Sequence, residues 1–139
     1  MTRKITHMIL SAALSALLGT ARLGGQSLRE VADIPFTFHA QQQTLPAGTY
    51  QVNEMGSNGV FQLIGPNRES IFVGPMAPAG ANPEKAHLTF ACFGKERVLA
   101  EIAMPGKGTA YHATRSQIEK NLAHKIGLAT MISVPLNGR

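Results

Sequence analysis

The sequence predicts a mainly β fold, a small antiparallel β-sandwich or partly open barrel with one short C-terminal helix. From Val31 onward, the apolar residues come in short bursts separated by turn residues. The chain has 14 glycines, 8 prolines, no tryptophan and only 15% charged residues, a composition that favours strands joined by tight turns over a helical bundle. A single Ser-x-x-Glu sequence at 116–119 marks the start of the one expected helix.

The chain divides into a predicted secretory signal peptide, residues 1–25, and a single β-rich domain, residues 26–139. Arg3 and Lys4 supply the positive start that an export signal needs, and an uncharged apolar stretch follows at 8–18. This stretch is shorter than the roughly 20 residues that a membrane-spanning helix requires. We therefore expect the protein to contact the membrane only through its signal peptide, before cleavage.

Small residues at 19–21 suit the cleft of signal peptidase. Cleavage is expected after Ala21 or, as a second choice, after Gly25. The alternatives are an uncleaved anchor or a buried first helix, and the lack of a cysteine near the cut disfavours a lipid anchor. The prediction is an exported protein of the periplasm or the extracellular space.

Charge argues against a nucleic-acid partner. The whole chain has 13 Lys and Arg against 8 Asp and Glu, a formal net charge of +5. Cleavage after Gly25 removes Arg3, Lys4 and Arg22, which lowers the net charge to +2. The remaining basic residues form no run, whereas proteins that track phosphates cluster theirs. The single cysteine excludes an internal disulfide, so packing must stabilise the domain.

The first strand is expected at 34–38, where Phe36 and Phe38 alternate with polar residues. Pro35 lacks a backbone N–H, so this strand begins there or lies at a sheet edge. Turns are predicted around Pro46 and at 55–59 and 65–67, and they separate strands at 49–52, 60–64 and 70–73. These three strands form a meander. Residues 74–84, with three prolines, are predicted to be an exposed loop.

A hairpin follows, with strands at 88–93 and 98–104 around a turn at 94–96. Leu88, Phe90 and Cys92 make one apolar face, while Phe93 and Leu99 on the opposite face hint at a second buried surface. A helix over the sheet would explain that second surface.

Ser116 and Glu119 have capping-box spacing at the start of the predicted helix. Ile118, Leu122 and Ile126 recur on one helical face, and Gly127 suits the helix end. The segment 130–134 is predicted to return as a last strand. One core is expected to join the N-terminal strands to the hairpin, closed by the helix through Ile118 and Leu122. Its members are large side chains at alternate strand positions: Phe36, Phe38, Tyr50, Leu88, Phe90 and Ile102.

Several of these motifs together resemble a family of small secreted acidobacterial proteins of unknown function. The shared runs are IPFTF at 34–38, LPAGTY at 45–50, and LTF at 88–90 followed by Gly94, Val98 and Leu99. The similarity covers residues 31–120 and implies the fold, but it implies no catalytic residue because its motifs are packing and turn residues. This chain departs from the family pattern: Val98 stands where an aromatic is usual, and Ala91 and Cys92 where polar or basic residues are usual.

The residues that could carry chemistry have ordinary structural explanations. Cys92 has no His or Met within reach downstream, as a blue-copper loop requires, and it alternates with apolar residues, which predicts a buried structural thiol. Of His39, His87, His112 and His124, no pair has local metal-site spacing, although His87 and His112 sit at the ends of predicted strands and could meet in space.

The carboxylates and hydroxyls give no catalytic pattern either. Glu96 and Glu101 are expected to pair with Arg97 or Lys85. Ser116 lacks a nucleophile elbow, and its capping role explains it. We therefore predict no catalytic, cofactor-binding or metal-binding residue, no cofactor and no enzymatic activity.

Two functions are consistent with this sequence. The first is a non-catalytic envelope or extracellular binding protein, whose partner is another envelope protein or a second copy of the chain, held through sheet edges or the 74–84 loop. The alternative is a carrier of a small apolar ligand in a β-barrel pocket.

Overall fold

Two β-sheets and one helix make up residues 29–79, 85–104 and 110–138, the part of the chain that the computed structural model describes. The fold is mainly β, as the sequence predicts: a curled sheet forms a half-barrel, a second sheet packs with it, and one short helix lies near the C-terminus. The predicted signal peptide lies outside the described residues, as do residues 80–84 of the predicted loop.

The first sheet contains the predicted meander. In spatial order its strands are β12 (Asn137–Gly138), β1 (Glu30–Ile34), β4 (Gly48–Met55), β5 (Val60–Ile64) and β6 (Ser70–Val73). Neighbouring strands pair antiparallel throughout. At the β4–β5 turn, Gly59 has a φ of +69°, and a side chain there would strike the backbone of Met76. Glycine is therefore required at this turn.

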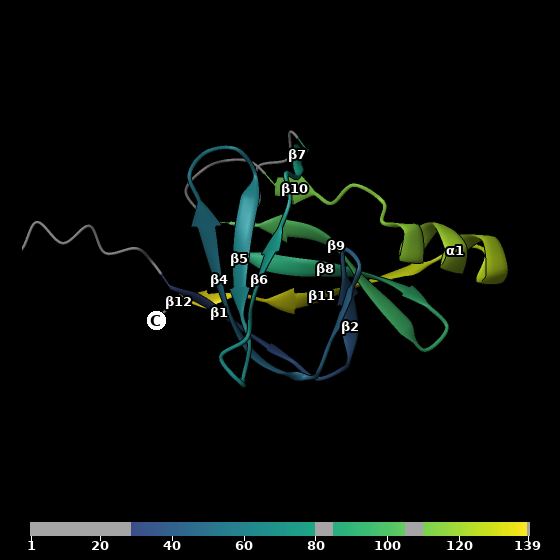
Figure 1. Cartoon of the computed structure of the whole chain (residues 1–139), viewed down its shortest axis with the longest axis horizontal. Coiled ribbons are helices and arrows are strands. Elements are labelled where there is room, and N and C mark those ends of the chain that lie inside the picture. Colours follow the sequence, from purple (N-terminus) through teal and green to yellow (C-terminus); the bar gives the residue numbers. More distant parts are fainter. Residues whose placement is uncertain (1–28, 80–84, 105–109, 139) are drawn as a thin grey trace, which may run out of the picture.

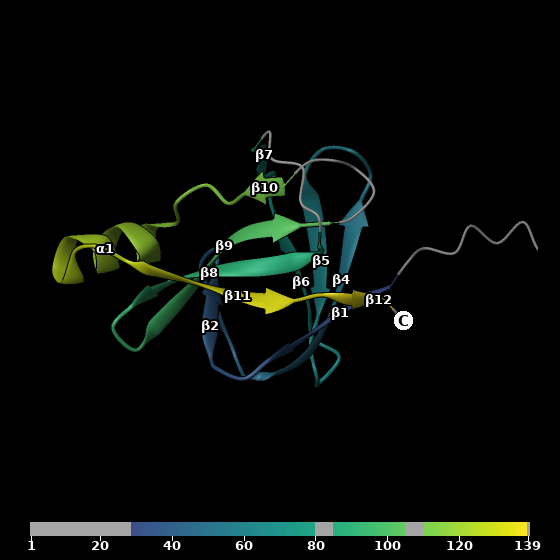
Figure 2. The same cartoon turned by 180° about the vertical axis from the view of Figure 1, so that it is seen from behind.

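The second sheet contains the predicted hairpin. In spatial order its strands are β11 (Thr130–Pro135), β8 (His87–Phe93), β9 (Glu96–Ala103), β10 (Ala110–His112) and β7 (Ala77–Pro78). The short strand β2 (Phe38–Ala40) pairs parallel with β9 and antiparallel with β3 (Gln43–Leu45). The strands β4, β5 and β6 run across the direction of β8, β9 and β11 in both views (Figures 1 and 2).

The prediction of one strand at 34–38 is wrong. β1 ends at Ile34, a bend at Phe36 follows, and β2 begins at Phe38 in the other sheet. Pro35 marks the break because it has no N–H to donate to a ladder. β1 is also no edge strand, because it lies between β12 and β4.

The described part of the predicted loop 74–84 is not a free loop. Ala77–Pro78 form β7, which pairs with β10, and Met76 is buried in the core with its backbone N–H donating to the Gly59 carbonyl at 2.8 Å. Prolines lack the N–H that hydrogen bonding between strands needs, so a proline-rich segment is not expected to form a strand. A two-residue strand at a sheet edge, such as β7, still tolerates a proline.

The predicted core is confirmed. Phe38, Tyr50, Leu88, Phe90 and Ile102 belong to one buried cluster, and the partly buried Phe36 packs against it. Aromatic edge contacts run through it from Tyr50 to Phe38 to Phe90, with ring centroids 5.2 and 5.3 Å apart. These contacts connect the two sheets, since Tyr50 comes from β4 and Phe90 from β8.

A second buried surface exists, but its members differ from the prediction. A bulge between Thr89 and Phe90 shifts the pairing of β8 with β9. As a result Leu99 points into the main core, and Val98 joins Ala91 and Phe93 in the second cluster. A bulge inserts one residue and so changes which face each following side chain occupies.

The helix α1 (Gln117–Ile126) covers this second cluster. Ser116 caps it, with Oγ accepting from the backbone N–H of Glu119 at 3.1 Å, and Gly127 ends it with a φ of +93°. Leu122 packs against the second cluster as predicted, but Ile126 is half exposed and the buried residue of the helix is Glu119.

In both views α1 lies at the end of the molecule away from β12 (Figures 1 and 2). Of the helical structure that the described residues contain, none is long and apolar enough to cross a membrane.

Candidate functional site

Two hollows border α1, and Glu119 lines both of them. The first, which we call the Glu119 hollow, has a volume of about 280 Å³. It lies between the β6–β7 connection, β9 and the start of α1. The residues that line it are Gln41, Val73, Gly74, Pro75, Met76, Val98, Leu99, Ala113, Thr114, Ser116 and Glu119.

Glu119 reaches this hollow because of its place in the helix. Capping by Ser116 makes Glu119 the third residue of α1, and Leu122 and Ala123, three and four residues later, pack on the sheet. Residues at this spacing share one helical face, so Glu119 lies on the buried side. Burial raises the pKa of its carboxyl above 4.5, and the Arg115 guanidinium, with Nε 3.7 Å from Oε1, opposes that rise.

The second hollow, which we call the α1 groove, has a volume of about 500 Å³ and lies between the helix and the β11 side of the second sheet. Its lining is largely apolar: Ala91, Phe93, Ala123, Gly127, Leu128, Ala129 and Met131, with Arg115 and Glu119 at its polar side. Leu128 is 99% exposed and Met131 64% exposed. Large exposed apolar side chains that gather at one place are characteristic of binding surfaces.

Among the described residues β11 is the last strand of the second sheet, so the groove borders a strand edge that pairs with no further strand, although β1 approaches β11. The N–H of Leu136 donates to the Ala86 carbonyl on the β8 side. Since antiparallel strands alternate the direction of their backbone groups, those of Met131 and Ser133 point away from β8. Pro135 follows at the next outward position and has no N–H. The free edge is thus short and centred on Met131 and Ser133.

Basic side chains lie at both ends of α1. Arg115 lines the α1 groove, and its side chain is 71% exposed. Lys125 is exposed and lies next to Ile126 near the end of the helix. Gly94, in the β8–β9 turn, is close to Ile126, because a Cβ added to Gly94 would lie 3.9 Å from the Ile126 side chain. The exposed Lys95, which follows Gly94, is therefore at the same end of the helix as Lys125.

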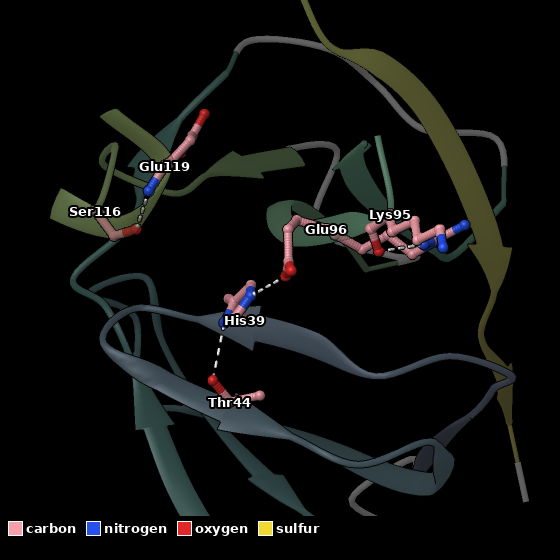
Figure 3. A network of polar contacts seen from close by, with 7 residues as sticks. His39, Thr44, Lys95, Glu96, Ser116 and Glu119 are labelled. Carbon is pink, nitrogen blue, oxygen red and sulfur yellow. Dashed lines mark hydrogen bonds and ion pairs between the residues drawn. The ribbon is translucent and has the colours of Figure 1, made fainter. Parts of the chain in front are cut away.

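A separate polar network joins β2, β3 and β9 (Figure 3). Thr44 Oγ1 lies 3.0 Å from His39 Nδ1, and His39 Nε2 lies 2.6 Å from Glu96 Oε2. The order of hydroxyl, imidazole and carboxylate is that of a nucleophilic triad. However, Thr44 and His39 are direct cross-strand partners, and neither hollow beside α1 is lined by Thr44. The network therefore ties the β2–β3 hairpin to β9.

His87 and His112 meet at one carboxylate, that of Glu101. His87 Nδ1 lies 2.9 Å from the Lys85 carbonyl, which can only accept, so Nδ1 carries a proton and donates it. His87 Nε2 then faces Glu101 Oε1 at 3.2 Å, and His112 Nδ1 lies 3.3 Å from Oε2. The prediction that Glu96 and Glu101 pair with Arg97 or Lys85 is wrong. Glu96 pairs with His39, and Glu101 pairs with His87 and His112.

Cys92 is a buried free thiol, as predicted. In the sheet, Cys92 lies opposite Arg97 of β9 and Thr130 of β11. Within residues 29–79, 85–104 and 110–138, no group of three or more His, Cys, Asp and Glu side chains could hold a metal ion.

No protein-family model, curated protein or solved structure matches the chain. The fold defines a small mainly β protein in which a half-barrel sheet and a second sheet share one aromatic core, with one capped helix. The resemblance to the small secreted acidobacterial proteins stays a prediction.

Proposed function

We propose that this chain is an exported, non-catalytic binding protein that holds an extended segment of another envelope or extracellular protein against β11. The observation that carries the proposal is the position of Met131. Its side chain is 64% exposed at the α1 groove, and its backbone groups face outward at the free edge of the sheet. An added strand would find backbone hydrogen bonds and an apolar surface at the same place.

The chemistry of the partner follows from the basic surroundings of the groove. Arg115 lines the groove, and Lys95 and Lys125 are exposed at the C-terminal end of α1. Of the nearby carboxylates, Glu119 is largely buried beside Arg115, and Glu96 is paired with His39. A second copy of the chain would bring like charges together, which costs energy. We therefore propose a partner segment in which apolar side chains alternate with carboxylates.

The alternative, a carrier of a small apolar ligand in a barrel pocket, has less support. Phe38, Tyr50, Phe61 and Phe90 are almost fully buried and fill the main core. The feature that favours this alternative most is the Glu119 hollow, but that hollow lies beside the helix and not inside a barrel.

Selection of short random peptides displayed on phage tests the proposal without presupposing a partner. The variant Met131→Asp puts a negative charge on the free edge, which should repel an acidic segment. Phe72→Asp is the matched control, because Phe72 is 57% exposed on β6, the edge strand of the other sheet. Peptides with alternating apolar and acidic residues should be selected, and Met131→Asp should weaken their binding about tenfold or more.

Phe72→Asp should leave that binding unchanged. Selection of basic peptides, or equal loss in both variants, would contradict the proposal. So would a preference for vesicles containing phosphatidylglycerol over every peptide, because the partner would then be a membrane.

Export is the second part of the proposal, and it is tested separately. N-terminal sequencing of the exported protein should begin near Arg22 or Gln26. An intact Met1 chain that stays in the cytoplasm would contradict export but not the binding site.

A further inference from the structure

The Glu119 hollow combines an apolar wall with one polar end. Val73, Met76, Val98, Leu99 and Ala113 make the wall. Gln41, Thr114, Ser116 and Glu119 make the polar end. A volume of about 280 Å³ is close to the lower limit of roughly 300 Å³ for small-molecule pockets, so a ligand would be small.

The carboxylate of Glu119 has unused acceptor capacity. The residue is only 8% exposed, yet within the described part of the chain its carboxylate has one charged neighbour, Arg115, at 3.7 Å. That distance is longer than a hydrogen bond. The Ser116 hydroxyl binds the backbone N–H of Glu119 and leaves the carboxylate oxygens unoccupied. Neither carboxylate oxygen of Glu119 is among the buried unpaired atoms of the described residues, so solvent reaches them. A charged donor in the hollow would replace that water with a charge-assisted hydrogen bond.

The other polar groups at this end also offer acceptors. Gln41 uses its Nε2 to donate to the Gly74 carbonyl at 3.2 Å, so its amide oxygen stays available. The hydroxyls of Thr114 and Ser116 can accept as well. A primary ammonium group carries three donors and no acceptor, which matches this set. An anionic ligand would be repelled by ionised Glu119.

We propose that the Glu119 hollow binds a small primary ammonium ion with a short apolar body. The ammonium group donates to the Glu119 carboxylate, and the apolar body lies against Pro75 and Ala113, the apolar lining residues that keep exposed surface. This site is distinct from the proposed protein-binding edge at Met131, although Glu119 borders both hollows. Burial raises the pKa of Glu119 in spite of the nearby Arg115 guanidinium, and a bound ammonium ion should lower it.

The test uses n-butylammonium as the probe, with 1-butanol and butyrate as neutral and anionic controls of similar length. Binding is followed by ¹H–¹⁵N NMR of the whole exported domain, in which the amides of Ala113 and Glu119 should shift. Glu119→Gln should weaken n-butylammonium binding about tenfold or more. Glu101→Gln, which changes a carboxylate outside the hollow, should leave the affinity unchanged.

A second measurement needs no variant. The carboxyl ¹³C signal of Glu119, followed through pH, should show a lower pKa when n-butylammonium is present. The proposal is overturned if butanol or butyrate binds as tightly as the amine, if both Glu→Gln variants bind alike, or if the Glu119 pKa does not move.

Discussion

The rings of Phe38 and Phe90 meet edge to face, with their centroids 5.3 Å apart and their planes inclined at 74°. Phe38 opens β2, and Phe90 lies on β8 beside the bulge, whose extra residue, Ala100, is on β9. Phe36 adds a second edge contact to Phe90 at 5.0 Å, and Tyr50 adds one to Phe38. Since Tyr50 belongs to the other sheet, these four rings connect both sheets through one set of contacts.

Phe90→Ala should therefore destabilise the domain strongly. Loss of a buried phenyl ring costs about 3–5 kcal/mol, a large share of the roughly 5–15 kcal/mol available to a small domain. Urea unfolding should show the variant mostly unfolded or marginal. Lys120→Ala, at an exposed helix position, should change the free energy of unfolding by less than about 0.5 kcal/mol. Equal stability of the two variants would contradict the core described above.

Tyr50 should make stability depend on alkaline pH. Burial raises its pKa from 10.0 to about 12, with the Glu69 carboxylate adding to the rise, and its hydroxyl donates to the Pro46 carbonyl at 2.6 Å. A raised pKa means that the folded state favours the neutral phenol. This stabilisation is complete below pH 10 and is lost as the pH rises through about 12. Urea unfolding between pH 10 and about 12 should show this loss of stability in the wild type and not in Tyr50→Phe. If the free energy of unfolding fell in parallel with pH in both proteins, Tyr50 would not be its cause.

Glu119→Gln should raise the free energy of unfolding at neutral pH. Because burial raises the pKa of Glu119 above 4.5, the folded state favours the protonated carboxyl. That preference stabilises the fold below pH 4.5 and is lost as the pH rises through the folded-state pKa. The gain in the variant should therefore disappear in acid. A variant less stable than wild type at pH 7 would show instead that the negative charge at the helix start dominates.

Cys92→Ala should lower the free energy of unfolding by about 1 kcal/mol or somewhat more, since it removes a small buried group. Binding of selected peptides should be unchanged. The native thiol should react slowly with a labelling reagent and rapidly in urea. Rapid labelling of the folded protein would contradict the burial.

Local chemistry explains which elements the sequence could predict. The turns at Pro46 and Gly59 and the cap at Ser116 depend on residues next to each other in the chain, and all three lie where the sequence places them. The strand break at Pro35 and the pairing of β7 with β10 depend on partners far away in sequence. The bulge beside Phe90 exchanges the roles of Val98 and Leu99, and alternation alone does not show it.

The candidate site was less predictable than the fold. In the sequence, the capping-box pattern already accounts for a glutamate at position 119. The sequence therefore gives no separate reason to expect that Glu119 is buried beside a hollow. Its spacing of three from Leu122 is the one indication, because it puts a carboxylate on the apolar face of the helix. The meeting of His87 and His112 at Glu101 requires β8, β9 and β10 in register, which no local pattern specifies.

Amide hydrogen exchange of residues 26–139, with and without a selected peptide, tests the proposed binding edge most directly. An added strand would take up the outward backbone groups of β11, so the amides of Met131 and Ser133 should become protected while those of β6 stay unchanged. Protection confined to β6, or no change at Met131 and Ser133 while the peptide is bound, would contradict the account.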